Sequence, residues 1–211
     1  NVVRNEKFGK MEKVSDNPLT VKYTINDGVK WSDGTPVTAA DLVLQWAAFS
    51  GYYNDADAEG KKGTSYFSYA GDPTGLALTD FPELGDDNRS MTIKYSKPFA
   101  DWEIALGGPG IDIPAHVLAK KAGLADAKAF VDMVKGMPRG DAKNPKPANK
   151  QLKAMADMWN TGFDTKTLPA DPSLFLSNGP YVVKAMNQDQ SLTMVKNKDY
   201  NWGPEAKLDE I

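Results

Sequence analysis

The stretch that decides the fold is Leu19–Val43, which reads LTVKYTINDGVKWSDGTPVTAADLV. From Leu19 to Asn26 apolar and polar residues alternate strictly, and this period of two predicts a strand with one buried face. The preceding segment, Phe8 to Val14, is its expected partner across the turn Ser15-Asp16-Asn17-Pro18. The chain is therefore expected to begin with a β-hairpin.

A helix is expected after two turn signals, Asp27-Gly28 and Asp33-Gly34. Thr38 is placed to accept hydrogen bonds from amides of the first helical turn, and Asp41, three residues later, can reach back to the Thr38 amide. Gly51 is expected to end this helix. Its apolar stripe consists of Leu42, Val43, Trp46, Ala47 and Phe49.

Turn residues and apolar spacing predict the remaining elements in the same way. The long segment from Tyr52 to Asp87 is expected to be mostly loop. The expected elements are a strand over 91–95, short helices around 65–69 and over 99–106, helices over 114–121, 125–135 and 149–160, and a hairpin made of 180–185 and 191–196.

Composition excludes several classes of function. The 211 residues carry a net charge of −3 and include one histidine and no cysteine, which excludes disulfides, zinc ribbons and multi-histidine metal sites. The chain has no basic stripe, so nucleic acid is not an expected partner. A Ser-His-Asp catalytic triad would have to use His116, the only histidine. No catalytic residue, metal site or cofactor is expected. An EF-hand calcium loop starting at Asp55 is excluded, because Tyr66 occupies the position that requires a bidentate glutamate.

Two motifs carry a family resemblance. The residues Trp31, Asp33, Gly34, Thr35, Pro36, Thr38, Ala39 and Asp41 resemble the signature of the family 5 extracellular solute-binding proteins, the oligopeptide, dipeptide and nickel receptors of ABC importers. A second match joins Ser177-Asn178-Gly179-Pro180-Tyr181 to Asn197-Lys198-Asp199-Tyr200-Asn201-Trp202. Leu42, and Ser177-Asn178 before Gly179, depart mildly from the family pattern. A weaker match is Ile113-Pro114-Ala115-His116, although His116 on its own residues is expected to be a surface or capping side chain.

The resemblance implies a mixed α/β fold, a lobe fragment like that of type II periplasmic binding proteins, with sheet hairpins and surrounding helices. Residues 1–211 would then be an internal part of lobe I, with the second lobe absent. Its expected divisions are a strand and helix subdomain over 14–135, a linker-like loop over 136–147, and a helix plus a hairpin returning towards the hinge over 148–211.

The resemblance also implies a ligand cleft. Its wall would include Tyr66, Phe67 and Tyr69, and its floor Gly107, Gly108 and Ile111. Tyrosines suit a peptide held by tolerant side-chain pockets, and glycines let a bound chain approach closely. The same aromatic residues could instead belong to the core, and the glycines could serve only loop packing. The signature motifs themselves are read as turn and capping chemistry rather than as binding groups.

The function implied is capture without catalysis. The chain would be the substrate-binding component of an ABC importer, taking a peptide or other small solute and passing it to the membrane permease. It would be extracytoplasmic, either periplasmic or anchored to the cell surface by a lipid. The identity of the ligand stays open, with oligopeptides, dipeptides, nickel chelates, haem and sugars as the alternatives. A hydrolytic enzyme and a stand-alone interaction module are the alternatives.

Overall fold

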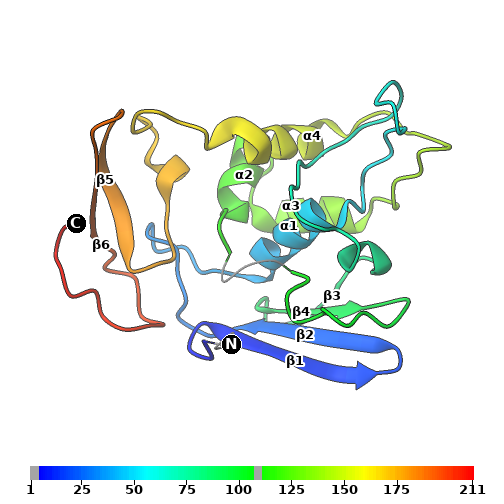
Figure 1. Ribbon diagram of the computed structural model, residues 1–211, viewed down its shortest axis with the longest axis horizontal. Helices are drawn as coiled ribbons and strands as arrows, with labels where there is room; N and C mark the ends of the chain where they lie inside the picture. The colour runs from blue at the N-terminus through cyan, green and yellow to red at the C-terminus, as the bar shows by residue number, and fades with distance from the viewer. Residues whose placement is uncertain (1–4, 107–110) are drawn as a thin grey trace.

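The computed structural model describes residues 5–106 and 111–211. The fold is mixed α/β, as expected, with sheet hairpins and surrounding helices (Figure 1). Its strands are β1 (Gly9–Asp16), β2 (Leu19–Ile25), β3 (Glu83–Leu84), β4 (Ser90–Lys94), β5 (Tyr181–Asn187) and β6 (Ser191–Lys196), and its α-helices are α1 (Ala39–Ser50), α2 (Ala115–Lys121), α3 (Ala127–Lys135) and α4 (Lys150–Asp157).

The first hairpin is confirmed and forms one side of an antiparallel sheet with the order β1-β2-β4-β3. Tyr23 on β2 pairs with Met11 on β1 and with Met91 on β4. The alternating apolar residues of β2 are buried, while the residues between them are half-exposed. The buried face of the sheet therefore receives the helices, which lie together on one side of it (Figure 1).

The cap of α1 is the capping box expected from the sequence. The Thr38 hydroxyl accepts a hydrogen bond from the Ala40 amide, and the Asp41 carboxylate accepts one from the Thr38 amide. Gly51 ends the helix with φ of 63°, a left-handed conformation that glycine adopts without steric cost. Nearly every residue of α1 is buried, so this helix is the central element of the helical layer.

The later helices differ from the expected ranges at their ends. α3 begins two residues later than expected because Asp126 acts as its N-cap, accepting from the Ala129 amide. α4, expected over 149–160, has Asn149 as its N-cap, and after Asp157 the chain continues as a π-helix, Met158–Gly162. Two 3₁₀ turns, Leu76–Leu78 and Pro172–Phe175, complete the helical elements of the described residues.

Two expected short helices are absent from the described residues, and those predictions were wrong. Around 65–69, the backbone groups of Tyr66 bond to distant side chains, since its amide donates to Asn54 Oδ1 and its carbonyl accepts from Asn160 Nδ2. A helix would need those groups for its own ladder. Residues 99–106 form successive turns closed by bonds three residues apart, such as Ile104 to Asp101, and do not extend into a helix.

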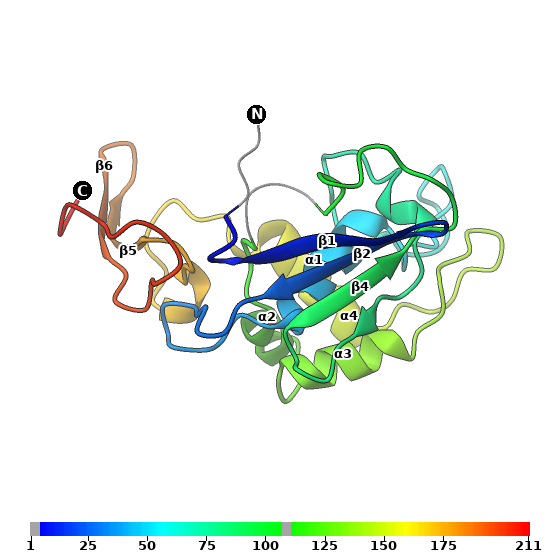
Figure 2. The same ribbon diagram turned by 90° about the horizontal axis from the view of Figure 1, so that it is seen from below.

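The C-terminal hairpin is confirmed, but it stands apart from the main core. β5 and β6 pair with each other, and residues 209–211 lie along β6, where the Met194 and Ile211 backbones exchange two hydrogen bonds. We call β5, β6 and residues 209–211 the C-terminal ribbon. It lies at one end of the molecule in both views (Figures 1 and 2). Leu192 and Ile211 of this ribbon remain 47% and 46% exposed, so the ribbon presents apolar side chains to solvent.

Candidate functional site

The family-like motifs meet in space at the N-terminal ends of α1 and α2. The signature turn, which we define as Trp31–Pro36, is closed by hydrogen bonds from the Trp31 amide to Thr35 and from the Gly34 amide to Trp31. Asp33 in this turn lies 3.0 Å from the Nε2 atom of His116 on α2. His116 was expected at a surface or capping position, and it is a half-buried tether between two motifs that lie 83 residues apart.

Asp33 is held as a carboxylate by its neighbours. Burial alone would raise its pKa, but the Thr35 amide and the His116 ring hydrogen-bond the charged form more strongly, so the pKa lies below its ordinary value of 3.8. The distance from the Thr35 amide to Asp33 Oδ1 is 2.9 Å. Both carboxylate oxygens are therefore occupied within the turn and its tether.

Asp41 connects the two helix starts directly. One carboxylate oxygen accepts from the Thr38 amide at 2.7 Å, and the other accepts from the Ala115 amide at 2.8 Å. The residue is 3% exposed, and this burial raises its pKa despite the hydrogen bonds. One buried side chain thus caps α1 and α2 together, which fixes their N-termini against each other.

The second motif bonds to the signature turn through Ser32. The Ser32 amide donates to the Ser177 carbonyl at 2.8 Å, and the Ser177 amide donates back to the Ser32 hydroxyl at 3.1 Å. Next to it, Asn178 Nδ2 donates to the Ile111 carbonyl at 2.7 Å. These three bonds attach the start of the C-terminal ribbon to the body of the protein.

The loop after β6 completes this attachment. Asn197 donates to the carbonyls of Ser177 and Gly179, and Asn201 donates to the carbonyl of Gly28. Trp202 donates from its indole to the Asn178 carbonyl at 2.7 Å, and its ring packs edge-on against Phe8 with centroids 4.9 Å apart. We call this set of bonds, from Ser32 and Gly28 to residues 177–202, the polar seam.

The expected wall residues lie at the opposite end of α1. Tyr66 and Phe67 are each 5% exposed and belong to the hydrophobic core, while Tyr69 is half-buried. Tyr69 stacks on Phe49 with ring centroids 4.2 Å apart, and both Phe49 and Phe67 meet Trp159 of the π-helix edge-on. The structure therefore places Phe67 and Tyr69 in an aromatic cluster with Phe49 and Trp159, while Tyr66 lies in the hydrophobic core. The binding role of the three predicted residues stays a prediction.

The expected floor residues are only partly described. Gly107 and Gly108 lie outside the described residues. Ile111 is 5% exposed and bonds through its carbonyl to Asn178, so its place is beside the polar seam rather than beside the aromatic cluster. The predicted wall residues and Ile111 thus lie in two regions, and nothing in the described residues tests whether either touches a ligand.

Sequence reasoning missed the residues that build the polar seam. Asn178, Asn197 and Asn201 each donate a side-chain amide to a backbone carbonyl. All three lie inside the second family-like match, so their position within it was the available signal. Their partners could not be named from sequence because those partners lie up to 173 residues away.

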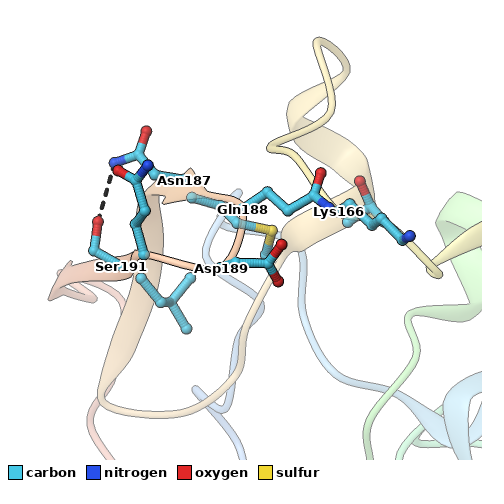
Figure 3. Close-up of a pocket in the computed structure, with 9 residues that line it drawn as sticks. Lys166, Asn187, Gln188, Asp189 and Ser191 are labelled. Carbon is cyan, nitrogen blue, oxygen red and sulfur yellow. Dashed lines mark hydrogen bonds between the residues drawn. The ribbon is translucent and has the colours of Figure 1, made fainter.

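One shallow hollow of about 600 Å³ lies beside the tip of the C-terminal ribbon. Figure 3 shows its polar rim, where Gln188 and Asp189 of the hairpin turn face Lys166 of the preceding loop. Its lining is Thr165, Lys166 and residues 186–192. The hollow is wide open, most of its lining residues have polar side chains, and it holds none of the residues predicted for the ligand cleft.

The described ranges, 5–106 and 111–211, contain neither a candidate metal site nor a helix that could span a membrane. No group of three or more histidine, cysteine, aspartate or glutamate side chains there could hold a metal ion. No described helix has the length and apolar character needed to cross a bilayer.

Comparisons with known proteins agree with the two motifs. Over residues 9–211 the chain matches the family described as bacterial extracellular solute-binding proteins, family 5 middle. It is 29% identical over 208 residues to a lipoprotein of Mycobacterium tuberculosis, covering 97% of this chain and 33% of that one. It is 27% identical to the oligopeptide-binding protein OppA of the same species, covering 97% of this chain and 25% of OppA.

A solved structure gives the same fold. The periplasmic EDTA-binding protein EppA superposes with a TM-score of 0.60 at 20% identity, covering 98% of this chain and 29% of EppA. The chain thus spans about a third or less of the length of these relatives. A family match over nearly all of the chain, joined to a shared fold, supports one conclusion. The chain belongs to the bacterial extracellular solute-binding proteins of family 5 and is extracytoplasmic.

Proposed function

We propose that this chain forms part of the substrate-binding component of an ABC importer, which captures a peptide or similar small solute and delivers it to the membrane permease. The observation that carries the proposal is the match to the family over residues 9–211, with both motifs of that family present and bonded to each other. The relatives include a protein named as an oligopeptide binder.

The proposed action is capture by closure of two lobes. A ligand drives closure only by its higher affinity for the closed state, so the mechanism needs surfaces that meet it in that state and no reactive group. His116, the sole histidine, is paired with Asp33 and is read as a tether rather than as a general base. Binding without catalysis is therefore the proposed function.

The chain is proposed to be an internal part of lobe I, divided as the sequence suggests into residues 14–135, 136–147 and 148–211. Exposed apolar side chains on the C-terminal ribbon support this division, because an isolated ribbon has no core of its own to stabilise it. We propose that the C-terminal ribbon leads towards the hinge and the other lobe.

The test of the function is a native mass spectrum of the protein purified from its source without refolding. We expect a mass excess of one small solute that disappears when the protein is denatured. A spectrum with no bound solute, together with no heat of binding for peptides, sugars or metal chelates, would count against the proposal.

The proposed ligand wall of Tyr66, Phe67 and Tyr69 has its own test. In the whole protein, Tyr69→Ala is expected to weaken binding of the recovered solute by about tenfold or more, since a buried aromatic contact contributes roughly 1.5 kcal/mol. Phe81→Ala is the matched control, because Phe81 is also half-buried and packs against α1, edge-on to Trp46. Equal affinities of the two variants would remove Tyr69 from the site.

A further inference from the structure

Asp27 and Gly28 form an exposed turn immediately after β2. The Asp27 side chain is 95% exposed, and the Gly28 amide nitrogen lies 3.1 Å from Asp27 Oδ1. Arg89 Nη1 lies 3.2 Å from the same oxygen, in an ion pair that solvent reaches on the Asp27 side. The carboxyl group and the next amide in the chain therefore lie side by side, as ring closure between them requires.

We propose that Asp27 is a site of spontaneous isomerisation to isoaspartate. The Gly28 nitrogen attacks Cγ of the protonated Asp27 carboxyl group and forms a C–N bond. The C–O bond breaks, and the hydroxyl leaves as water with the amide proton, which closes a succinimide ring. Water then adds to the main-chain carbonyl of the ring and opens its bond to nitrogen, so the chain runs through Cβ and Cγ. No oxidant or reductant takes part, and the composition is unchanged.

The local backbone favours this reaction. Gly28 has φ of 84° and no side chain, so nothing on the attacking residue obstructs the approach of its nitrogen. The described hydrogen bond of the Gly28 amide is the one to Asp27 itself. The reacting nitrogen is thus not held in a separate turn or ladder that would have to open first.

The chain contains two similar dipeptides in protected settings. At Asp33-Gly34, the carboxylate oxygens accept from the Thr35 amide and from His116, and the Gly34 amide donates to the Trp31 carbonyl. At Asn178-Gly179, the side chain donates to Ile111 and the Gly179 amide donates to the Ser177 hydroxyl. In both places the reacting groups are bonded elsewhere, so the fold is expected to suppress the reaction there.

Isomerisation at Asp27 would alter the polar seam. The Gly28 carbonyl accepts a hydrogen bond from Asn201 Nδ2 at 2.9 Å. An added methylene in the main chain shifts that carbonyl relative to the loop that carries Asn201. The modification therefore acts on the contact between the end of β2 and residues 197–202, and this inference does not depend on the proposed function.

The experiment incubates the native protein at mildly acidic pH and follows isoaspartate at each site by peptide mapping with electron-transfer fragmentation. We expect isoaspartate to form at Asp27 at least about tenfold faster than at Asp33. In denaturing urea, where the fold no longer protects Asp33, the two rates should converge to within about twofold because the dipeptides are identical.

Two variants sharpen the test. Asp27→Glu should abolish the product at that position while the fold is retained, because the longer side chain closes a six-membered ring far more slowly. His116→Ala, which frees Oδ2 of Asp33, should raise the rate at Asp33 and leave Asp27 unchanged. Equal rates of isoaspartate formation at Asp27 and Asp33 in the native protein would overturn the proposal. So would the absence of detectable isoaspartate at Asp27 in the native protein when it forms at a measurable rate in urea.

Discussion

Replacement of Asp41 by alanine should be the costliest loss of a helix cap in this protein. The side chain accepts two backbone hydrogen bonds, from Thr38 at 2.7 Å and from Ala115 at 2.8 Å. Hydrogen bonds to charged groups contribute about 1.5–3 kcal/mol each, so their loss costs about 3–6 kcal/mol. Removing a buried carboxylate also removes the cost of burying its charge, which offsets part of that loss in stability. We expect a net loss of about 2–4 kcal/mol in the free energy of unfolding.

Asp126→Ala is the matched control, because Asp126 caps only α3 and accepts one described backbone bond, from Ala129. It should cost about 1 kcal/mol. Asp41→Asn keeps the shape but offers one acceptor oxygen in place of two, so it should fall between the two alanine variants.

The assay is urea unfolding followed by tryptophan fluorescence, with unchanged slopes required before free energies are compared. If Asp41→Ala costs no more than Asp126→Ala, the double cap does not connect the two helices energetically, and the reasoning fails.

Three further predictions concern the same region and the aromatic cluster. Asp33→Asn should destabilise the protein at neutral pH, because the pKa of Asp33 is lower in the fold than in the unfolded chain. Its difference from the wild type in the free energy of unfolding should shrink as pH falls below 3.8 and vanish below the folded-state pKa; unfolding curves across pH check this. Ser32→Cys with Ser177→Cys, in a chain without other cysteines, should form a disulfide that raises the free energy of unfolding by about 2–4 kcal/mol over the reduced form; no difference between oxidised and reduced protein would contradict the polar seam. Tyr66→Phe removes the hydroxyl that accepts from the Asn149 amide at the start of α4 and should cost about 1 kcal/mol in thermal or urea unfolding.

Local chemistry explains which elements were predictable from sequence. The period of two in β2 and the capping box of α1 specify their own geometry within a few residues, and both were confirmed. The ends of α3 and α4 were less accurate because Asp126 and the π-helix after Asp157 shift the boundaries without changing the apolar stripe.

Long-range bonds explain what sequence could not supply. The aromatic run around Tyr66 has helical spacing, but Asn54 and Asn160 take its backbone groups from 12 and 94 residues away. The tether between Asp33 and His116 likewise joins residues from separate motifs. Family resemblance named both motifs, yet only the folded chain brings them together and separates Ile111 from the aromatic cluster.

We propose that this chain is one part of a receptor whose solute is held between two lobes. Its most direct test is calorimetric titration of the solute recovered from the whole protein, both into that protein and into residues 1–211 alone, with circular dichroism to verify folding of each. We expect submicromolar binding to the whole protein and none detectable for residues 1–211. Equal submicromolar affinity for both would show that residues 1–211 suffice as a binding site and would contradict the proposed two-lobe site.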